Sequence, residues 1–198
     1  MYDYSYDAEL QASNTPFRGY SDQITSIVIG EGVTTVGSEA FLELEDLKTV
    51  LLPESLTSIG TYAFAHCESL TEIVIPDQVG TIDGWAFWEC INLTTVVLPE
   101  NLTTLGSNAF AWCSKLQDIT IPANTTNITG ETFENCFKLE HIALPSGLQK
   151  VGFRMFQGCT GLKSVSIPKS VKTIEQNAFS SCTALTDVYY GGSETDRY

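Results

Sequence analysis

Apolar residues recur along this chain with a period of 23 residues, and no insertion or deletion interrupts the period. Seven complete copies follow one another, and an eighth, incomplete copy begins at Leu185. A single unit of this length cannot bury its apolar face alone, so the repeat predicts a solenoid in which each copy packs on its neighbours. The complete copies begin at Ile24, Leu47, Leu70, Leu93, Leu116, Leu139 and Leu162.

The first half of each copy predicts a short β-strand. Positions 4 and 6 of the repeat are apolar, and alternate residues of a strand share one side, so these positions are expected to face the interior. Position 7 is proline in six copies, from Pro53 to Pro168. Proline cannot donate to a β-ladder and is therefore expected to end each strand. Positions 3 and 5 are then expected to face outward.

The second half of the first six copies carries a glycine at position 14 or 15, and most copies have Ala-Phe at positions 17 and 18. The recurring glycine indicates a turn that needs a positive φ. We interpret the segment after it as a short helical turn on the convex side. Position 18 predicts a spine of stacked rings inside the solenoid, formed by Phe41, Phe64, Phe87, Phe110, Phe133, Phe156 and Phe179.

All six cysteines stand at position 21, so stacking brings them about 5 Å apart, within disulfide reach. Leu44 occupies the same position in the first copy. A position that accepts leucine favours buried free thiols that pack as small hydrophobes. Disulfides and a metal site are the alternatives, although no histidine shares this phase. The cysteines are Cys67, Cys90, Cys113, Cys136, Cys159 and Cys182.

The pattern LxxIxIPxxVxxIGxxAFxxCxx resembles that of the BspA-like, or Treponema-type, leucine-rich repeats over residues 24 to 190. The resemblance implies an α/β, right-handed leucine-rich-repeat solenoid with a parallel β-sheet on its concave face. It also implies export to the bacterial cell surface and adhesion or ligand binding, without catalytic residues. Residues 1–23 resemble the end of an N-terminal cap, residues 24–184 are the repeats, and residues 185–198 resemble a partial repeat and the start of a C-terminal cap. The chain thus resembles a fragment of a longer surface protein from gut bacteria.

The net charge of −14 is unevenly distributed. Residues 1–100 hold 16 acidic and 2 basic side chains, whereas residues 101–198 hold 8 of each. Such a surface repels phosphate backbones and argues against a nucleic-acid partner. No stretch has the 18 or so apolar residues of a membrane span, and residues 1–23 lack the pattern of a signal peptide. No cofactor is indicated, and a monomer is expected.

Two outward rows in the N-terminal half form the first candidate surface. Position 5 predicts an exposed apolar stripe that suits a partner, although β-propensity also explains such residues. Position 8 predicts an acidic rail that could collect calcium or steer a basic partner, although a solvated face explains it as well. The apolar stripe is Val28, Leu51, Val74 and Val97, the acidic rail is Glu31, Glu54, Asp77 and Glu100, and Glu72 lies beside them at position 3.

Catalysis is not expected. Asp118, His141 and Ser164 stand at position 3 of consecutive copies and have the residue types of a hydrolase triad. An open sheet offers no turn for an oxyanion hole, however. Paired carboxylates such as Glu72 and Asp118 lack a pocket that would tune a glycosidase pair. No metal-binding or catalytic residue is therefore predicted.

Aromatic residues outside the core pattern form a second candidate surface, which we call the aromatic flank. A partner or a sugar ring could stack there, although packing between neighbouring turns explains the same residues. We expect a non-enzymatic, extracellular cell-surface module that recognises a protein or a glycan on its concave face. The alternatives are a structural spacer and an accessory module of a larger surface-anchored enzyme. The aromatic flank is Tyr62, Trp85, Trp88 and Trp112.

Overall fold

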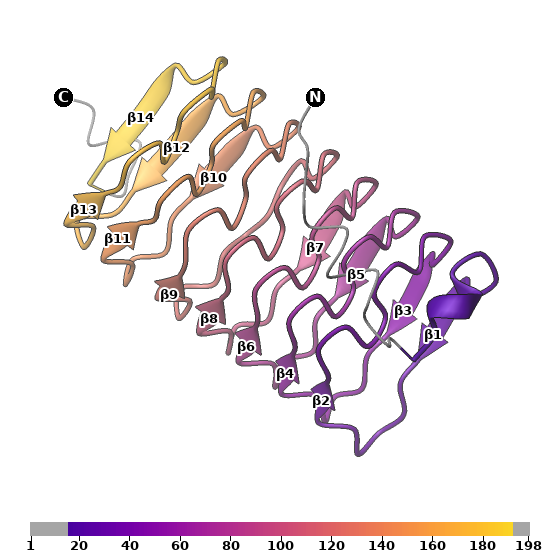
Figure 1. The fold of residues 1–198 in the computed structure, drawn as a ribbon. Coiled ribbons are helices and arrows are strands. Elements are labelled where there is room, and N and C mark those ends of the chain that lie inside the picture. Colours follow the sequence, from indigo (N-terminus) through magenta and orange to yellow (C-terminus); the bar gives the residue numbers. More distant parts are fainter. Residues whose placement is uncertain (1–15, 192–198) are drawn as a thin grey trace.

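The computed structural model describes residues 16–191, which form one continuous coil of stacked turns (Figure 1). Each repeat makes one turn of the coil and passes through two β-ladders and one wall of turns. All strand pairs are parallel, and paired residues are 23 positions apart, as Ile27 and Val50 are. The repeat length is therefore the length of one layer, and the predicted parallel solenoid is confirmed. Within the described residues the single helix is the 3-10 helix η1 (Arg18–Tyr20).

Positions 3 to 5 of the repeat build the first ladder, which we call the front ladder and which was predicted. Its position 4 points inward, so Val50 and Ile73 are buried between exposed neighbours. Copy five adds no strand to it and contributes an isolated bridge between Asp118 and Thr95. Within residues 16–191 the ladder therefore consists of β1-β3, β5-β7 and β10-β12-β14. Its strands are β1 (Ser26–Val28), β3 (Thr49–Leu51), β5 (Glu72–Val74), β7 (Thr95–Val97), β10 (His141–Ala143), β12 (Ser164–Ile167) and β14 (Asp187–Tyr190).

A second ladder, which we call the side ladder, was not predicted. Positions 12 and 13 of each repeat form two-residue strands along the lower edge of Figure 1. Position 13 points inward, and Ile59, Ile82 and Leu105 are fully buried. The ladder is continuous from β2 to β9 and resumes as β11-β13. Its strands are β2 (Thr35–Val36), β4 (Ser58–Ile59), β6 (Thr81–Ile82), β8 (Thr104–Leu105), β9 (Asn127–Ile128), β11 (Lys150–Val151) and β13 (Thr173–Ile174).

Positions 16 to 22 form the third wall, which we call the turn wall, and the prediction of a helical turn there is wrong. The segment consists of consecutive β-turns, with Ala63 N donating to Gly60 O at 3.2 Å. Alternate amides donate to the next copy instead, as Phe64 N does to Ala86 O at 2.8 Å. A helix would use these amides within one copy, so turns are the conformation that lets the layers bond to one another.

The prediction that the recurring glycine needs a positive φ is also wrong. Gly60, Gly106 and Gly152 at position 14 lie where two layers touch, and none of the three has a positive φ. A Cβ on Gly106 would lie 2.2 Å from the backbone nitrogen of Gly84, so only glycine fits there. The positive φ values fall on positions 16 and 20 instead, as in Tyr62 (57°) and His66 (58°).

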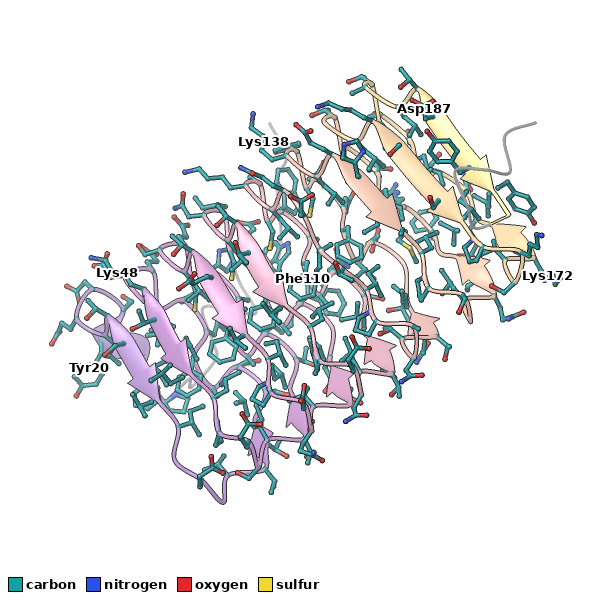
Figure 2. All side chains as sticks on the ribbon, turned by 180° about the vertical axis from the view of Figure 1, so that it is seen from behind. Tyr20, Lys48, Phe110, Lys138, Lys172 and Asp187 are labelled. Carbon is teal, nitrogen blue, oxygen red and sulfur yellow. The ribbon has the colours of Figure 1, made fainter. Side chains whose placement is uncertain are left out.

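The predicted spine of phenylalanine rings is confirmed. Neighbouring rings from Phe41 to Phe179 stack with centroids 5.2 to 5.9 Å apart. Figure 2 shows Phe110 in the interior of the array. Phe17, which lies before the first repeat, adds a further ring 5.7 Å from Phe41. The spine therefore begins outside the repeats, which the 23-residue pattern did not reveal.

The six cysteines are free, and all but the partly buried Cys182 are buried, in agreement with the sequence prediction. Each thiol also donates a hydrogen bond to the position-18 carbonyl of the preceding copy. Cys113 Sγ, for example, lies 3.3 Å from Phe87 O. Burial raises the pKa of the Cys67 thiol to about 12 and that of Cys182 to about 11. The residue is therefore more than a small hydrophobe, because its weak S–H donor meets a buried acceptor.

Candidate binding surfaces on the front ladder and the turn wall

The structure places the four residues of the apolar stripe on the outer side of the front ladder. Their exposed fractions are 73% for Val28, 63% for Leu51, 63% for Val74 and 50% for Val97. Val28 pairs in register with Leu51, and Val74 pairs with Val97. Exposed Glu72 begins the strand that contains Val74. Four large apolar side chains thus remain in water along one row, which is the geometry that the sequence predicted.

The acidic rail is exposed, but its first member already has a structural role. Glu31 Oε1 accepts a hydrogen bond from Glu54 N at 3.1 Å, and Glu31 Oε2 accepts one from Ser55 N at 3.3 Å. Its carboxylate therefore ties the loops of the first two copies together. Among residues 16–191 no group of three or more His, Cys, Asp or Glu side chains is arranged to hold a metal ion. The rail supplies negative charge beside the apolar stripe.

Where copy five leaves the front ladder, the outer face contains a hollow of about 480 Å³. Asp118, His141 and Ser164 all line it. His141 Nδ1 lies 2.7 Å from Ser164 Oγ, and Glu140 is the carboxylate nearest to the imidazole, 4.0 Å from Nε2. Ser164 is the first residue of β12, and its backbone amide donates to Glu140 O of the neighbouring copy at 3.3 Å. The pair forms a hydrogen bond without donors arranged for an oxyanion.

The aromatic flank is mainly a second, small core on the turn wall. Trp88 is only 8% exposed and is buried with Leu42, Ala65 and Ala111. Tyr62 and Trp85 stack with their ring centroids 5.3 Å apart and pack against this core, as does Trp112. The structure therefore brings the four predicted residues together, and interlayer packing explains a large part of their burial.

Beside this core lies a groove of about 690 Å³, and sequence reasoning found its aromatic residues but missed its polar ones. Trp85, Trp88 and Trp112 line one end of the groove, and polar side chains, mainly of copies five and six, line the other. Burial, together with the neighbouring charge of Glu131, raises the pKa of the Glu134 carboxyl. The available signal was positional, because these residues occupy positions 16, 19 and 20 of the turn wall, and position 19 is apolar in the first four copies. The polar lining includes Asn108, Glu131, Glu134, Asn135, Arg154 and Gln157.

The parallel ladders, the one-repeat register and the stacked rings together define a leucine-rich-repeat solenoid. The family model described as a BspA type leucine rich repeat region matches residues 13–140 and 103–196, with six copies. The chain therefore belongs to the BspA type leucine rich repeat family. Residues 16–191 contain no helix with the length and apolar character needed to cross a bilayer.

Solved structures agree with this assignment. The leucine rich repeat protein of T. pallidum is 30% identical with a TM-score of 0.79, and the match covers 82% of this chain and 78% of that one. A leucine-rich repeat protein from Bacteroides ovatus is 32% identical with a TM-score of 0.67, over 83% of this chain and 48% of that one. The pneumococcal vaccine antigen PcpA, 16% identical with a TM-score of 0.56 over 86% of this chain and 57% of that one, shares the fold. No curated protein sequence matches significantly.

Proposed function

We propose that this chain is a non-enzymatic, cell-surface binding module whose front ladder recognises a protein partner. The observation that carries the proposal is the apolar stripe, because Val28, Leu51 and Val74 each expose more than 60% of their area in one row. Large apolar side chains that line up in water are typical of interaction surfaces. Localisation at the surface rests on family membership.

The flanking charge narrows the kind of partner. The acidic rail and the excess of carboxylates in residues 1–100 favour a protein with an apolar strip and basic margins. In copies five to seven the same row carries Thr120, Ala143 and Ser166, which offer little apolar area and no charge. The binding surface is therefore assigned to copies one to four.

A paired-variant capture experiment tests this proposal. The immobilised chain is exposed to extracellular protein extracts at low and high salt, next to the variant Leu51→Asp, Val74→Asp. The matched control is Thr120→Asp, Ser166→Asp, which adds the same charges to the other half of the row. We expect a protein that the native chain and the control retain at low salt and that the stripe variant loses.

Circular dichroism should show the same fold in all three proteins, because the four substituted side chains lie on the outer face of the ladder. Equal retention by the native chain and the stripe variant would rule out the front ladder as the binding surface. Failure to retain any protein would favour a spacer.

A further inference from the structure

The side chains that line the groove on the turn wall change from aromatic to polar along the solenoid axis. At position 19 successive copies present Trp88, Ala111, Glu134 and Gln157. At position 16 they present Trp85, Asn108, Glu131 and Arg154. Both rows change from aromatic to polar side chains in the same direction, and the small Ala111 separates Trp88 from Glu134. Because stacked layers lie about 5 Å apart, an elongated ligand that follows the groove meets first rings and then polar groups.

The polar end of the groove is held in place by its own hydrogen bonds. Gln157 Nε2 donates to Glu134 Oε1 at 2.7 Å, and Asn108 Nδ2 donates to Glu131 Oε2 at 3.1 Å. Arg154 Nη1 lies 3.7 Å from Glu131 Oε1. These contacts fix the planes of the carboxylates before any ligand arrives, which lowers the entropy that binding would cost.

Hydrogen-bonding capacity remains at this end after those contacts. Within residues 16–191 the bond from Gln157 is the single hydrogen bond to the Glu134 carboxylate, so Oε2 is left as an acceptor. Arg154 Nε is buried and has no acceptor there. A buried donor without a partner is costly. A ligand lying in the groove does not reach this nitrogen and meets the rest of the guanidinium instead, because the Arg154 side chain as a whole is 40% exposed.

The aromatic end offers partly exposed indole surface. Trp85 is held by the stacked ring of Tyr62, and Trp112 by the edge of Phe137, whose ring centroid is 5.9 Å away. Neither indole is fully buried. Fixed aromatic surface next to a few oriented polar groups is the usual composition of a small-ligand site.

We propose that this groove is a carbohydrate site that binds a neutral oligosaccharide. A pyranose presents an apolar C–H face, which suits the indoles of Trp85 and Trp112, and a rim of hydroxyl groups. Hydroxyls both donate and accept, so they suit a polar end that mixes the acceptors of Glu131 and Glu134 with the donors of Arg154. The site is on a different wall from the front ladder and does not depend on the function proposed for that ladder.

The charges in the groove distinguish a neutral sugar from charged ligands. Two carboxylates repel a uronic acid or another anion. A lysine-rich or arginine-rich ligand meets the positive charge of Arg154, and Glu131 already contacts that guanidinium. A neutral ligand rich in hydroxyl groups can donate to the carboxylates at the polar end and accept from the Arg154 guanidinium.

Intrinsic tryptophan fluorescence can report on this site, so no added label is needed. It contains three tryptophans, and all three line the groove. The probes are cellohexaose, chitohexaose, maltohexaose and mannohexaose, each added to the full chain while tryptophan emission is recorded. Hexagalacturonate and hexalysine are the charged comparators. We expect a saturable change with at least one neutral hexasaccharide and none with hexagalacturonate.

Variants then assign the signal to the groove. Glu134→Gln keeps the side-chain shape and the bond from Gln157 but removes the charge and an acceptor lone pair, and Trp112→Phe shrinks the stacking surface. Each should weaken binding of the sugar at least tenfold, measured by calorimetry. The front variant Leu51→Asp, Val74→Asp should bind it as tightly as the native chain. The proposal is overturned if no neutral hexasaccharide binds at millimolar concentration, if hexalysine binds more tightly, or if both groove variants bind unchanged.

Discussion

Positions 16 and 20 of each repeat adopt the left-handed backbone conformation, although in most copies the residue there is not glycine. Glu39 has φ of 57° and Glu43 has φ of 62°. For residues other than Gly, Asn and Asp, this conformation costs about 1–2 kcal/mol of conformational energy. The cost recurs in each layer because the β-turns of the turn wall require it. Where a copy has Asn108 or Asn135 instead, the local strain is smaller.

Replacing Glu39 by Asn should therefore stabilise the array. We expect the free energy of unfolding to rise by about 0.5–1 kcal/mol, because asparagine tolerates positive φ and the amide bond from Glu39 N to Thr61 O is kept. Urea unfolding followed by circular dichroism measures the change. Glu45→Asn is the matched control, since it removes the same charge at an exposed residue whose φ is not positive, and it should change stability by less than about 0.5 kcal/mol. Equal effects of the two substitutions would contradict the strain argument.

The buried thiols predict a loss of stability in alkali. Burial raises the pKa of Cys67 from its ordinary 9.0 to about 12 and also raises those of Cys90 and Cys113. Between pH 9 and 12 the unfolded thiols lose protons that the folded thiols keep. Because the thiol pKa is higher in the folded state than in the unfolded state, its contribution to stability is complete at a pH below the unfolded-state pKa. As the pH rises above that value, the contribution is lost by roughly 1 kcal/mol per pH unit for each thiol.

Urea midpoints measured from pH 8 to pH 10 should therefore fall steadily. Cys113→Ala, which lacks one buried thiol, should show a shallower slope than the native chain. An identical slope would show that other groups cause the alkaline loss.

At the scale of elements, the sequence predicted the strands whose residues alternate between apolar and polar. It failed to predict the side ladder and the role of the position-14 glycine. Alternating positions 4 and 6 correctly indicated the front ladder. The side ladder has only two residues per strand, as in β6, so no alternation marks it. The glycine of position 14 was read as a turn residue, but Gly106 is needed because the backbone of Gly84 lies against it. A single sequence does not distinguish those two reasons for glycine.

Copy five shows how a polar residue can replace an apolar one inside a layer. Thr125 stands where other copies carry Val or Leu, and the sequence alone suggests that restoring Val would stabilise by about 1 kcal/mol. The structure shows Thr125 fully buried, with Oγ1 donating to Leu102 O at 2.9 Å. The loss of that hydrogen bond, also worth about 1 kcal/mol, offsets the gain.

Thr125→Val should accordingly leave the free energy of unfolding within about 0.5 kcal/mol of the native value. Thr125→Ala loses both the hydrogen bond and the methyl contact and should cost about 2 kcal/mol. Urea unfolding of the two variants side by side separates these terms. A clear gain from valine would mean that the hydroxyl contributes nothing.

At the scale of the whole molecule, the two candidate surfaces differ in how far the sequence could reveal them. The apolar stripe follows from the repeat phase alone, because position 5 must point away from position 4. The groove does not, because Glu131, Glu134 and Arg154 belong to no motif. They come together because copies five and six carry polar side chains at positions 16 and 19 of the turn wall, whereas position 19 of the first four copies is apolar and buried. Departures from the residue types of the other copies at positions 16 and 19 are the signal that locates such a groove.

The phenylalanine spine connects the layers, so removing one of its rings should change the stability and the cooperativity of unfolding of the whole array. The fully buried Phe110 stacks between Phe87 at 5.3 Å and Phe133 at 5.9 Å. Phe110→Ala should lower the free energy of unfolding by about 3–5 kcal/mol. Because repeats are stabilised by their nearest neighbours, the two sides of the gap should then unfold in separate steps.

Two probes make that separation visible. Tryptophan emission reports on copies three and four, which hold Trp85, Trp88 and Trp112, whereas circular dichroism reports on every layer. The two urea curves should coincide for the native chain and diverge for Phe110→Ala. Phe153→Ala is the control, because that ring is 37% exposed and lies outside the spine, and its curves should still coincide. Coincident curves with an unchanged midpoint for Phe110→Ala would show that the stacked rings do not couple the layers.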